Sequence, residues 1–343
     1  MRSAAYHVRW TVSLCLMALV VASAQTPSPA LLVSLRINNS KSGGVLAIVD
    51  PVARKVVGRI PIAEDPHGLT VSPDGRFAFI AHSNGNSVSM IDLAARKEVH
   101  RLQLGPASEP HDIQAVDGKV YFTVEGYKAI ARYDPATKQV DWWQGAGQNG
   151  MHMMAVSRDA SRIFTANNTS NSVTVFERGP ATSPGWQVTT IPVGKLPEGI
   201  GMTPDGKEVW VVNKAAGGGI SILDAATKKI VQTLDVQLNH ANRIDFTPDG
   251  RRAIVLDEEG DLVVMDVPSR KEITRIQVMA NSLLIGPDGK AYATVAPGFQ
   301  KSPRIEGIGN HVAVIDLRTL ELTHRIEVGN PNPDTIAWAQ RRP

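Results

Sequence analysis

Short apolar stretches alternate with polar turns along the chain, and one order of stretches recurs about every 40 to 45 residues. Its clearest copy runs from Pro66 to Gly105 and reads PHGLTVSPDGRFAFIAHSNGNSVSMIDLAARKEVHRLQLG. Four stretches rich in β-branched residues are separated there by Asp-Gly or Asn- and Ser-rich turns, a pattern typical of antiparallel meanders. No helical period persists, which excludes a helical solenoid.

The stretches that precede the Asp-Gly turns set the number of repeats at seven, and they read HGLTV, HDIQA, HMMAV, EGIGM, NRIDF, NSLLI and DTIAWA. The chain starts with what should be second, third and fourth strands, LLVSLRI, GVLAIVD and KVVGRIPI, and ends on a lone first strand, TIAWA. A sheet assembled from both ends closes a ring and removes open edges. The sequence therefore predicts an all-β, seven-bladed β-propeller with four antiparallel strands per blade and one blade shared by the two chain ends.

Two of these units carry a recognisable motif, SPDGRFAFIAHSNGNSVSMIDLAARKEV and TPDGKEVWVVNKAAGGGISILDAATKKIV. They resemble the YVTN-type β-propeller repeat, in which an SPDGK turn leads to a YVTN-like strand and then to SVSVID. The similarity covers all seven units and implies the fold. It does not choose a function, because that repeat family includes surface and periplasmic proteins of unassigned activity and propellers support many chemistries.

One blade resembles a second family. GKVYFTVEGYKAIARYDPATKQV, residues 118–140, is similar to the repeats of streptogramin lyases, propellers that open cyclic ester antibiotics by metal-assisted elimination. The YVTN-like repeat also resembles the propeller of cytochrome cd1 nitrite reductases. The first resemblance implies a metal-dependent lyase, and the second a site for d1-haem with a histidine axial ligand.

The first 24 residues read as a secretory signal peptide. Arg2 and Arg9 precede an apolar run, and Ala22-Ser23-Ala24 supplies the small residues that a signal peptidase accepts. We expect a mature propeller of residues 25–343 in the periplasm or outside the cell, without a membrane span. Cys15 is the only cysteine, so the mature chain would lack disulfides, thiolate metal sites and a Cys nucleophile.

Charge argues against two classes of partner. Removal of residues 1–24 takes away two Arg and no acidic residue, which leaves 34 basic and 33 acidic residues. Nucleic acids and anionic membranes are bound by clustered basic faces. We therefore expect a monomer that binds a small molecule or a protein on one face of the propeller, and no nucleic acid.

Polar residues occupy one equivalent position in every unit, about seven residues before the Asp of the turn. We expect this position at the top mouth of the central channel, where strand four crosses to the next strand one. Its occupants are His67, His111, His152, Glu198, Asn242, Asn281 and Asp334, and His240 lies two residues ahead of Asn242.

Three chemistries suit this set of residues. Neutral imidazoles with a carboxylate suit a divalent transition metal such as Zn²⁺, Fe²⁺, Mn²⁺ or Cu²⁺, with His67, His111 and His152 as ligands and Glu198 as a fourth ligand or general base. Protonated imidazoles would instead bind an anion, or act as general acid and base. Polar residues at this position would also cap the crossing loops, a purely structural role.

Top loops add further candidates. Glu125 follows the lyase-like strand, near His111, and would orient an imidazole or take part in catalysis; the alternative is a solvated loop glutamate. Arg304 lies in the longest top loop, residues 296–311, and would offer a fork to a carboxylate or phosphate. We assign Asn168 and Asn213 to turns.

Three functional hypotheses follow. The first is a secreted or periplasmic binding or interaction protein with a ligand or metal site at the channel mouth, in which Asn242, Asn281, Asp334, His240 and Arg304 contact the ligand. The second is a metal-dependent lyase or hydrolase, similar to streptogramin lyases or lactonases, that uses the His and Glu residues. The third is a propeller that binds d1-haem or takes part in redox chemistry. No nucleophile elbow, phosphate-binding loop, dinucleotide fingerprint or haem-attachment motif is present.

Overall fold

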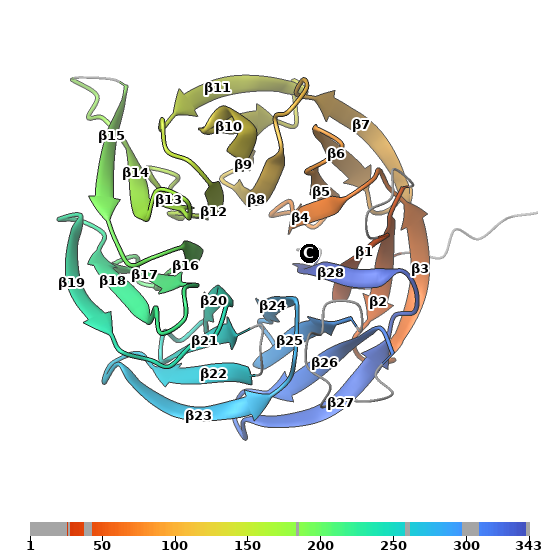
Figure 1. Ribbon diagram of the computed structural model, residues 1–343. Helices are drawn as coiled ribbons and strands as arrows, with labels where there is room; N and C mark the ends of the chain where they lie inside the picture. The colour runs from red at the N-terminus through yellow and green to blue at the C-terminus, as the bar shows by residue number, and fades with distance from the viewer. Residues whose placement is uncertain are drawn as a thin grey trace, which may run out of the picture.

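The computed structural model describes residues 26, 28–37, 43–182, 185–257, 261–296 and 309–340. These residues form seven four-stranded antiparallel sheets arranged as blades around a central axis (Figure 1). The predicted seven-bladed propeller is confirmed. The predicted signal peptide and Arg304 lie outside the described residues. Within the described part of the chain, no helix is long and apolar enough to cross a membrane.

Each blade is a meander whose first strand lies next to the axis. Blade 1 contains β28 (Asn332–Ala339), β1 (Ala30–Arg36), β2 (Val45–Asp50) and β3 (Lys55–Pro61). Blade 2 contains β4 (Pro66–Val71), β5 (Phe77–His82), β6 (Ser87–Asp92) and β7 (Lys97–Gln103). Blade 3 contains β8 (Pro110–Val116), β9 (Lys119–Val124), the 3₁₀ turn η1 (Glu125–Tyr127), β10 (Ala129–Asp134) and β11 (Gln139–Gly145). Blade 4 contains β12 (Met151–Val156), β13 (Arg162–Asn167), β14 (Ser172–Arg178) and β15 (Trp186–Pro192).

The remaining blades repeat this order. Blade 5 contains β16 (Pro197–Met202), β17 (Glu208–Asn213), β18 (Ile220–Asp224) and β19 (Lys229–Leu234). Blade 6 contains β20 (Ala241–Phe246), β21 (Arg252–Asp257), β22 (Asp261–Asp266) and β23 (Lys271–Gln277). Blade 7 contains β24 (Ser282–Ile285), β25 (Lys290–Val295), β26 (His311–Asp316) and β27 (Glu321–Glu327).

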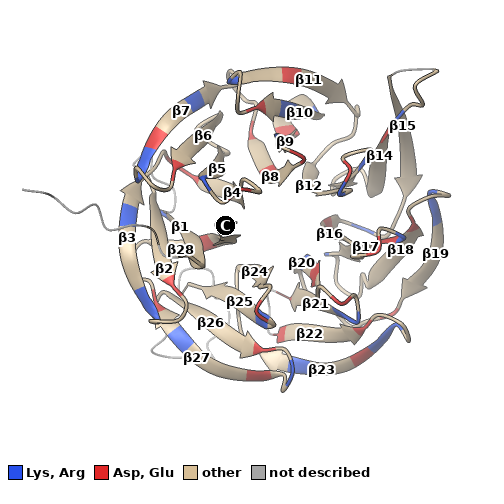
Figure 2. Ribbon diagram, turned by 180° about the vertical axis from the view of Figure 1, so that it is seen from behind, with Lys and Arg blue, Asp and Glu red and all other residues tan. Residues whose placement is uncertain are grey.

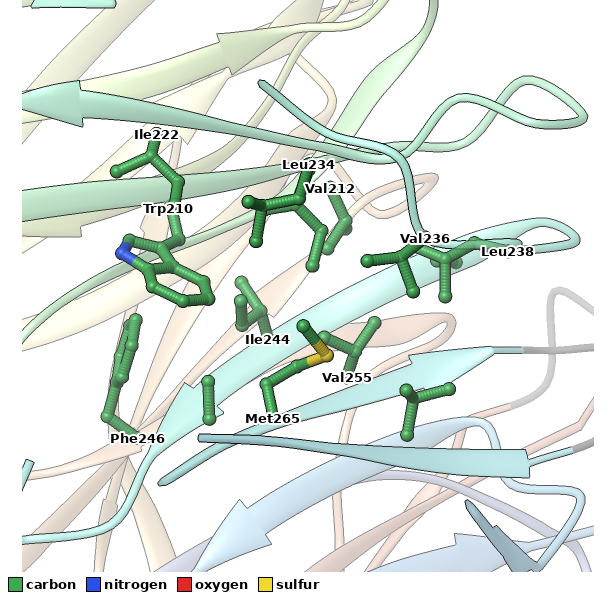
Figure 3. Packing of buried hydrophobic residues seen from close by; sticks show 14 residues of the cluster. Trp210, Val212, Ile222, Leu234, Val236, Leu238, Ile244, Phe246, Val255 and Met265 are labelled. Atoms are coloured by element: carbon green, nitrogen blue, oxygen red, sulfur yellow. The ribbon is translucent and has the colours of Figure 1, made fainter. Parts of the chain in front are cut away.

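The core lies between neighbouring blades. Middle strands such as β17 and β21 are buried on both faces, because each blade packs a sheet on either side. Figure 3 shows the layer between blades 5 and 6, where the Trp210 ring meets the Phe246 ring edge-on at 5.7 Å between centroids and Met265 packs below. Each blade thus depends on its neighbours to bury its apolar faces.

Outer strands face solvent and carry charges of both signs. Red and blue segments are interspersed along the rim in Figure 2, and some form pairs along one strand, such as Arg101 with Glu98 on β7 and Arg275 with Glu272 on β23. Such exposed pairs contribute little to stability, about 0 to 1 kcal/mol each.

The Asp-Gly turns explain why the repeats are visible in sequence. The carboxylate of Asp74 accepts a hydrogen bond from the amide of Arg76 at 3.0 Å, and Gly75 has a φ of 70°. Glycine adopts this left-handed conformation without steric cost. The same Asp-to-amide bond forms at Asp159, Asp205 and Asp249. All these turns lie at the bottom face, so the polar residues before each inner strand lie at the top.

Both chain ends close the ring, as predicted. β28 pairs with β1 from Ala30 opposite Ala339 to Arg36 opposite Asn332. The amide of Thr335 donates to the Ser34 hydroxyl at 3.0 Å inside this pair. Because β28 also carries the mouth residue Asp334, ring closure fixes one wall of the channel mouth.

Candidate metal and ligand site at the channel mouth

The inner strands form the wall of the channel. Around the axis in Figure 1 they follow one another as β4, β8, β12, β16, β20, β24 and β28. Each of the seven predicted mouth residues lies on its inner strand or directly before it, as Asn281 lies before β24. The seven positions that align between the sequence repeats therefore lie at the same end of the seven inner strands.

Five of the seven mouth residues touch in sequence around the ring. The Asp334 carboxylate lies 3.5 Å from His67 Nδ1, and the His67 and His111 ring centroids lie 4.0 Å apart. The His111 and His152 ring centroids lie 3.7 Å apart, and His152 Nδ1 lies 3.6 Å from Glu198 Oε1. We call these five residues the mouth arc; it consists of three imidazoles flanked by two carboxylates.

Each end of the mouth arc is held by a cation. Arg36 Nε lies 3.4 Å from Asp334, and Arg36 also pairs with Asp65 at 3.3 Å. At the other end, Lys214 Nζ lies 3.2 Å from Glu198 Oε1. These cations stabilise the ionised carboxylates and leave the imidazoles between them.

Asn168 also contacts the mouth arc, at its Glu198 end. Its amide nitrogen donates to Glu198 Oε2 at 3.0 Å. The prediction of a turn role alone for Asn168 was incomplete, because its side chain reaches Glu198 on the neighbouring blade. The turn role of Asn213 is confirmed, since its amide donates to the Gly218 carbonyl at 2.9 Å.

Glu125 joins the two central imidazoles. Potential ligand atoms of His111, Glu125 and His152 all lie within 4.8 Å of one another. Glu125 opens the short η1 turn, whose backbone is tied to the crossing loop because the Glu125 amide donates to the Glu109 carbonyl. The third predicted imidazole ligand, His67, lies outside this group and sits between His111 and Asp334.

Burial controls the protonation of this group. It lowers the pKa of His152 to about 4, and it lowers that of His111 well below the usual value, with a further contribution from the charges of His67 and His152. Both imidazoles are therefore neutral at pH 7, the form that binds metals. Burial, followed by repulsion from Glu109 and Glu198, raises the pKa of Glu125 to about 7.

The two flanking carboxylates behave differently. Burial alone would raise the pKa of Glu198, but His152 and Lys214 hold it below the ordinary value. Burial likewise opposes ionisation of Asp334, whose pKa is lowered by His67 and Arg36. The site thus combines two ionised ends with a central carboxyl that titrates near neutrality.

Three other predicted ligand residues are not members of the mouth arc. Asn281 donates to the Pro333 carbonyl at 3.0 Å and so links blade 7 to blade 1. Asn242 is buried at the start of β20. His240 is exposed in the loop before β20, with a φ of 62°. Among the described residues, none of these three belongs to the close His and Glu group.

A channel continues below the mouth. It has a volume of about 510 Å³, and its wall includes His67, His111 and residues of all seven inner strands. Such a volume falls in the range of small-molecule sites. The polar mouth therefore opens onto a space large enough for a ligand.

Three charged residues of this region, Arg36, Lys214 and Arg243, were missed by the sequence reasoning. Arg36 ends β1, Lys214 lies in a top loop, and Arg243 follows the mouth residue Asn242. The repeat alignment singled out one position per blade, and none of the three occupies it. The sequence could have identified Arg243, because it directly follows the mouth residue Asn242.

Comparison with known proteins gives the fold alone. No family model and no curated protein matches this sequence. A chain of Kuenenia stuttgartiensis hydrazine synthase is similar in structure, with a TM-score of 0.63 and 16% identity, over 87% of this chain and 98% of that one. A Lactobacillus plantarum protein has a TM-score of 0.70 and 15% identity over 91% and 99%. A functionally unknown protein from Desulfotomaculum acetoxidans DSM 771 has 0.72 and 14% over 92% and 100%. The YVTN repeat type stays a prediction.

Proposed function

We propose that this protein is a secreted or periplasmic β-propeller that binds a divalent transition metal at its channel mouth and uses it to hold a small ligand. The metal ligands are His111, His152 and Glu125. The observation that carries the proposal is the convergence of their ligand atoms within 4.8 Å. Two imidazoles and a carboxylate form a donor set typical of zinc and related metals.

Unsatisfied polar atoms support a cation here. His152 Nδ1 is buried without a hydrogen-bonding partner, and Glu198 lies 3.6 Å from it. A buried polar atom without a partner costs about 1 to 3 kcal/mol, and a bound metal would satisfy the His152 nitrogen. The half-buried Glu125 carboxylate has no hydrogen bond or ion pair to any other described residue, so it is available as a ligand.

Catalysis is a second candidate function. Catalytic zinc sites hold the metal with three protein ligands and keep one position for water or substrate, whereas structural sites use four. The His111, His152 and Glu125 set has three members, which favours a metal-dependent lyase or hydrolase. A metal bound there would polarise a carbonyl or activate water. Glu198, held ionised by Lys214 beside His152, would then accept a proton.

Metal analysis tests the proposed function. Mature protein purified without a histidine tag should contain about one transition metal ion per chain, or take up one Zn²⁺ in a titration. His111→Ala and His152→Ala should each lower zinc affinity by at least the roughly 10- to 100-fold that loss of a metal's outer partner costs. His324→Ala, on the outer strand β27, is the matched control and should bind zinc normally.

Two results would contradict the metal site. One is the absence of zinc binding by wild-type protein, and the other is unchanged zinc binding by both mouth variants.

The d1-haem hypothesis stays a prediction, and it requires a Soret band after reconstitution with haem. The location is inferred from residues 1–24, and N-terminal sequencing of exported protein should give a mature chain that begins at Gln25.

A further inference from the structure

A second level of side chains lies directly below the mouth. The residue that follows each mouth position lines the channel on all seven inner strands. The only charged residues at these seven positions are Asp112 and Arg243. On β4 and β16 the position is occupied by a glycine, Gly68 and Gly199. The two glycines let the next inner strand approach closely, since a Cβ on Gly68 would lie 2.4 Å from the His111 carbonyl oxygen and one on Gly199 would lie 2.8 Å from the Arg243 Cα.

Arg243 reaches across part of the channel. It belongs to blade 6, yet its Nη1 lies 2.9 Å from Met153 Sδ on blade 4, two blades away. The same nitrogen donates to the Asn242 carbonyl at 3.1 Å. Besides burial, the Arg243 charge contributes to the lowered pKa of both His111 and His152. The guanidinium therefore lies in the channel below the imidazoles.

The acidic groups of the channel wall are already occupied. The two Asp112 oxygens accept hydrogen bonds from the amides of Ile113 and Met154, each at 2.9 Å. The Asp245 carboxylate accepts the amides of Phe246 at 2.8 Å and Ile285 at 3.2 Å. Within the described ranges, no carboxylate forms an ion pair with Arg243. Most of its five donors thus remain available.

We propose that Arg243 is an anion subsite of the channel and that its ligand is a small monocarboxylate with an apolar tail. The planar guanidinium matches a carboxylate through two parallel hydrogen bonds. Met153, Leu284 and Trp338 lie on the same channel wall and would contact the tail. The subsite rests on the proposed function, because it places the ligand's head group below His111 and His152, at the metal site.

Charge argues for a monoanion over phosphate. The channel wall contains one permanent cation, Arg243, and two carboxylates, Asp112 and Asp245. A phosphate dianion would bring a second negative charge beside these carboxylates without a second cation to offset it. A monocarboxylate needs only the one guanidinium.

Calorimetric titration with hexanoate tests the subsite. Wild-type protein at pH 7 should bind hexanoate more tightly than the neutral isostere hexanamide, and inorganic phosphate should not compete. Arg243→Gln should lower hexanoate affinity by about 10- to 100-fold, the usual effect of a hydrogen bond to a charged group. Arg243→Lys keeps the positive charge but cannot form the two parallel hydrogen bonds of a guanidinium, so it should give an intermediate affinity.

Controls separate the possible failures. Arg318→Gln, at an exposed bottom turn, should leave hexanoate binding unchanged, and thermal melting identifies any variant that fails to fold. If Arg243→Gln does not fold, wild type and Arg243→Lys still decide the question. Equal binding of hexanoate and hexanamide by wild type, or unchanged hexanoate binding by a folded Arg243 variant, would overturn the subsite. Zinc titration of the same proteins distinguishes this from failure of the metal site, because Arg243→Gln should still bind zinc.

Discussion

Buried carboxylates connect neighbouring inner strands where the backbone does not. Inner strands of adjacent blades belong to different sheets, so their facing amides need other acceptors. Asp245 on β20 supplies one of these acceptors to Ile285 on β24, in the neighbouring blade. Burial raises the pKa of Asp245 to about 6, because two backbone amides compensate only part of the lost hydration.

The raised pKa of Asp245 makes the stability of the protein depend on pH in a defined direction. Between the ordinary pKa of about 4 and the folded value of about 6, the folded state binds the proton more tightly, so stability falls as pH rises. Asp245→Asn should remove this contribution. Relative to wild type, the variant should gain roughly 2 kcal/mol between pH 4 and pH 7. Its absolute stability also changes because one acceptor oxygen is lost, so the measurement is the pH dependence of urea unfolding. Parallel profiles for the two proteins would contradict the raised pKa.

Individual site residues differ in how far the sequence reveals them. His67, His111, His152 and Glu198 were predicted to lie together because each repeat places the same position at the same height. Glu125 was placed near His111 by its loop, but its approach to His152 depends on the packing of two blades. Lys214 comes from a top loop of blade 5 whose length is not repeated, so no alignment of blades identifies it.

At the level of elements, glycines allow inner strands to approach closely. A Cβ built on Gly199 of β16 would lie 2.8 Å from the Arg243 Cα of β20, closer than real side chains approach. Because of this close approach, the Arg243 backbone packs directly against β16. Its side chain extends from there into the channel. Gly199 is therefore required by tertiary packing, although a glycine inside a strand weakens it locally.

Gly199→Ala should destabilise the protein by about 1 to 3 kcal/mol, the usual cost of overpacking. Gly145→Ala at the end of β11 is the matched control, since a Cβ there meets nothing within 4 Å. The control should be neutral or more stable by about 0.4 to 1 kcal/mol, because alanine restricts the unfolded chain. Chemical denaturation measures both. Equal stability of the two variants would show that β16 and β20 can separate at no cost.

The sequence predicted elements well where the repeat is regular. The stretch FAFIAH after the Asp74 turn forms β5, and SVSMID forms β6. The η1 turn was not predicted, because three residues after a strand carry no periodic signal. That omission matters for function, since η1 carries Glu125 to the imidazoles.

For the whole molecule, ring closure and the site are coupled. β28 provides Asp334 to the mouth arc and Trp338 to the channel wall, while its pairing with β1 closes the ring. This closure was predictable because the chain starts with second, third and fourth strands and ends on a first strand. Which side of each strand faces the axis was not, since alternation along so short a strand permits either orientation.

Removal of β28 should therefore open the ring and disrupt the mouth in one step. A protein that ends at Gly329 lacks the closing strand and exposes the edge of β1, so it should self-associate and elute earlier than the full-length protein in size-exclusion chromatography. A synthetic peptide of residues 330–340 should pair with β1 and restore the full-length elution volume and melting transition, because strand addition supplies the missing hydrogen bonds. The same peptide with Asp334→Asn should restore the elution volume while removing the charge that pairs with Arg36 and His67. A truncated protein with the elution volume and melting temperature of the full-length protein would show that six blades and an open sheet suffice.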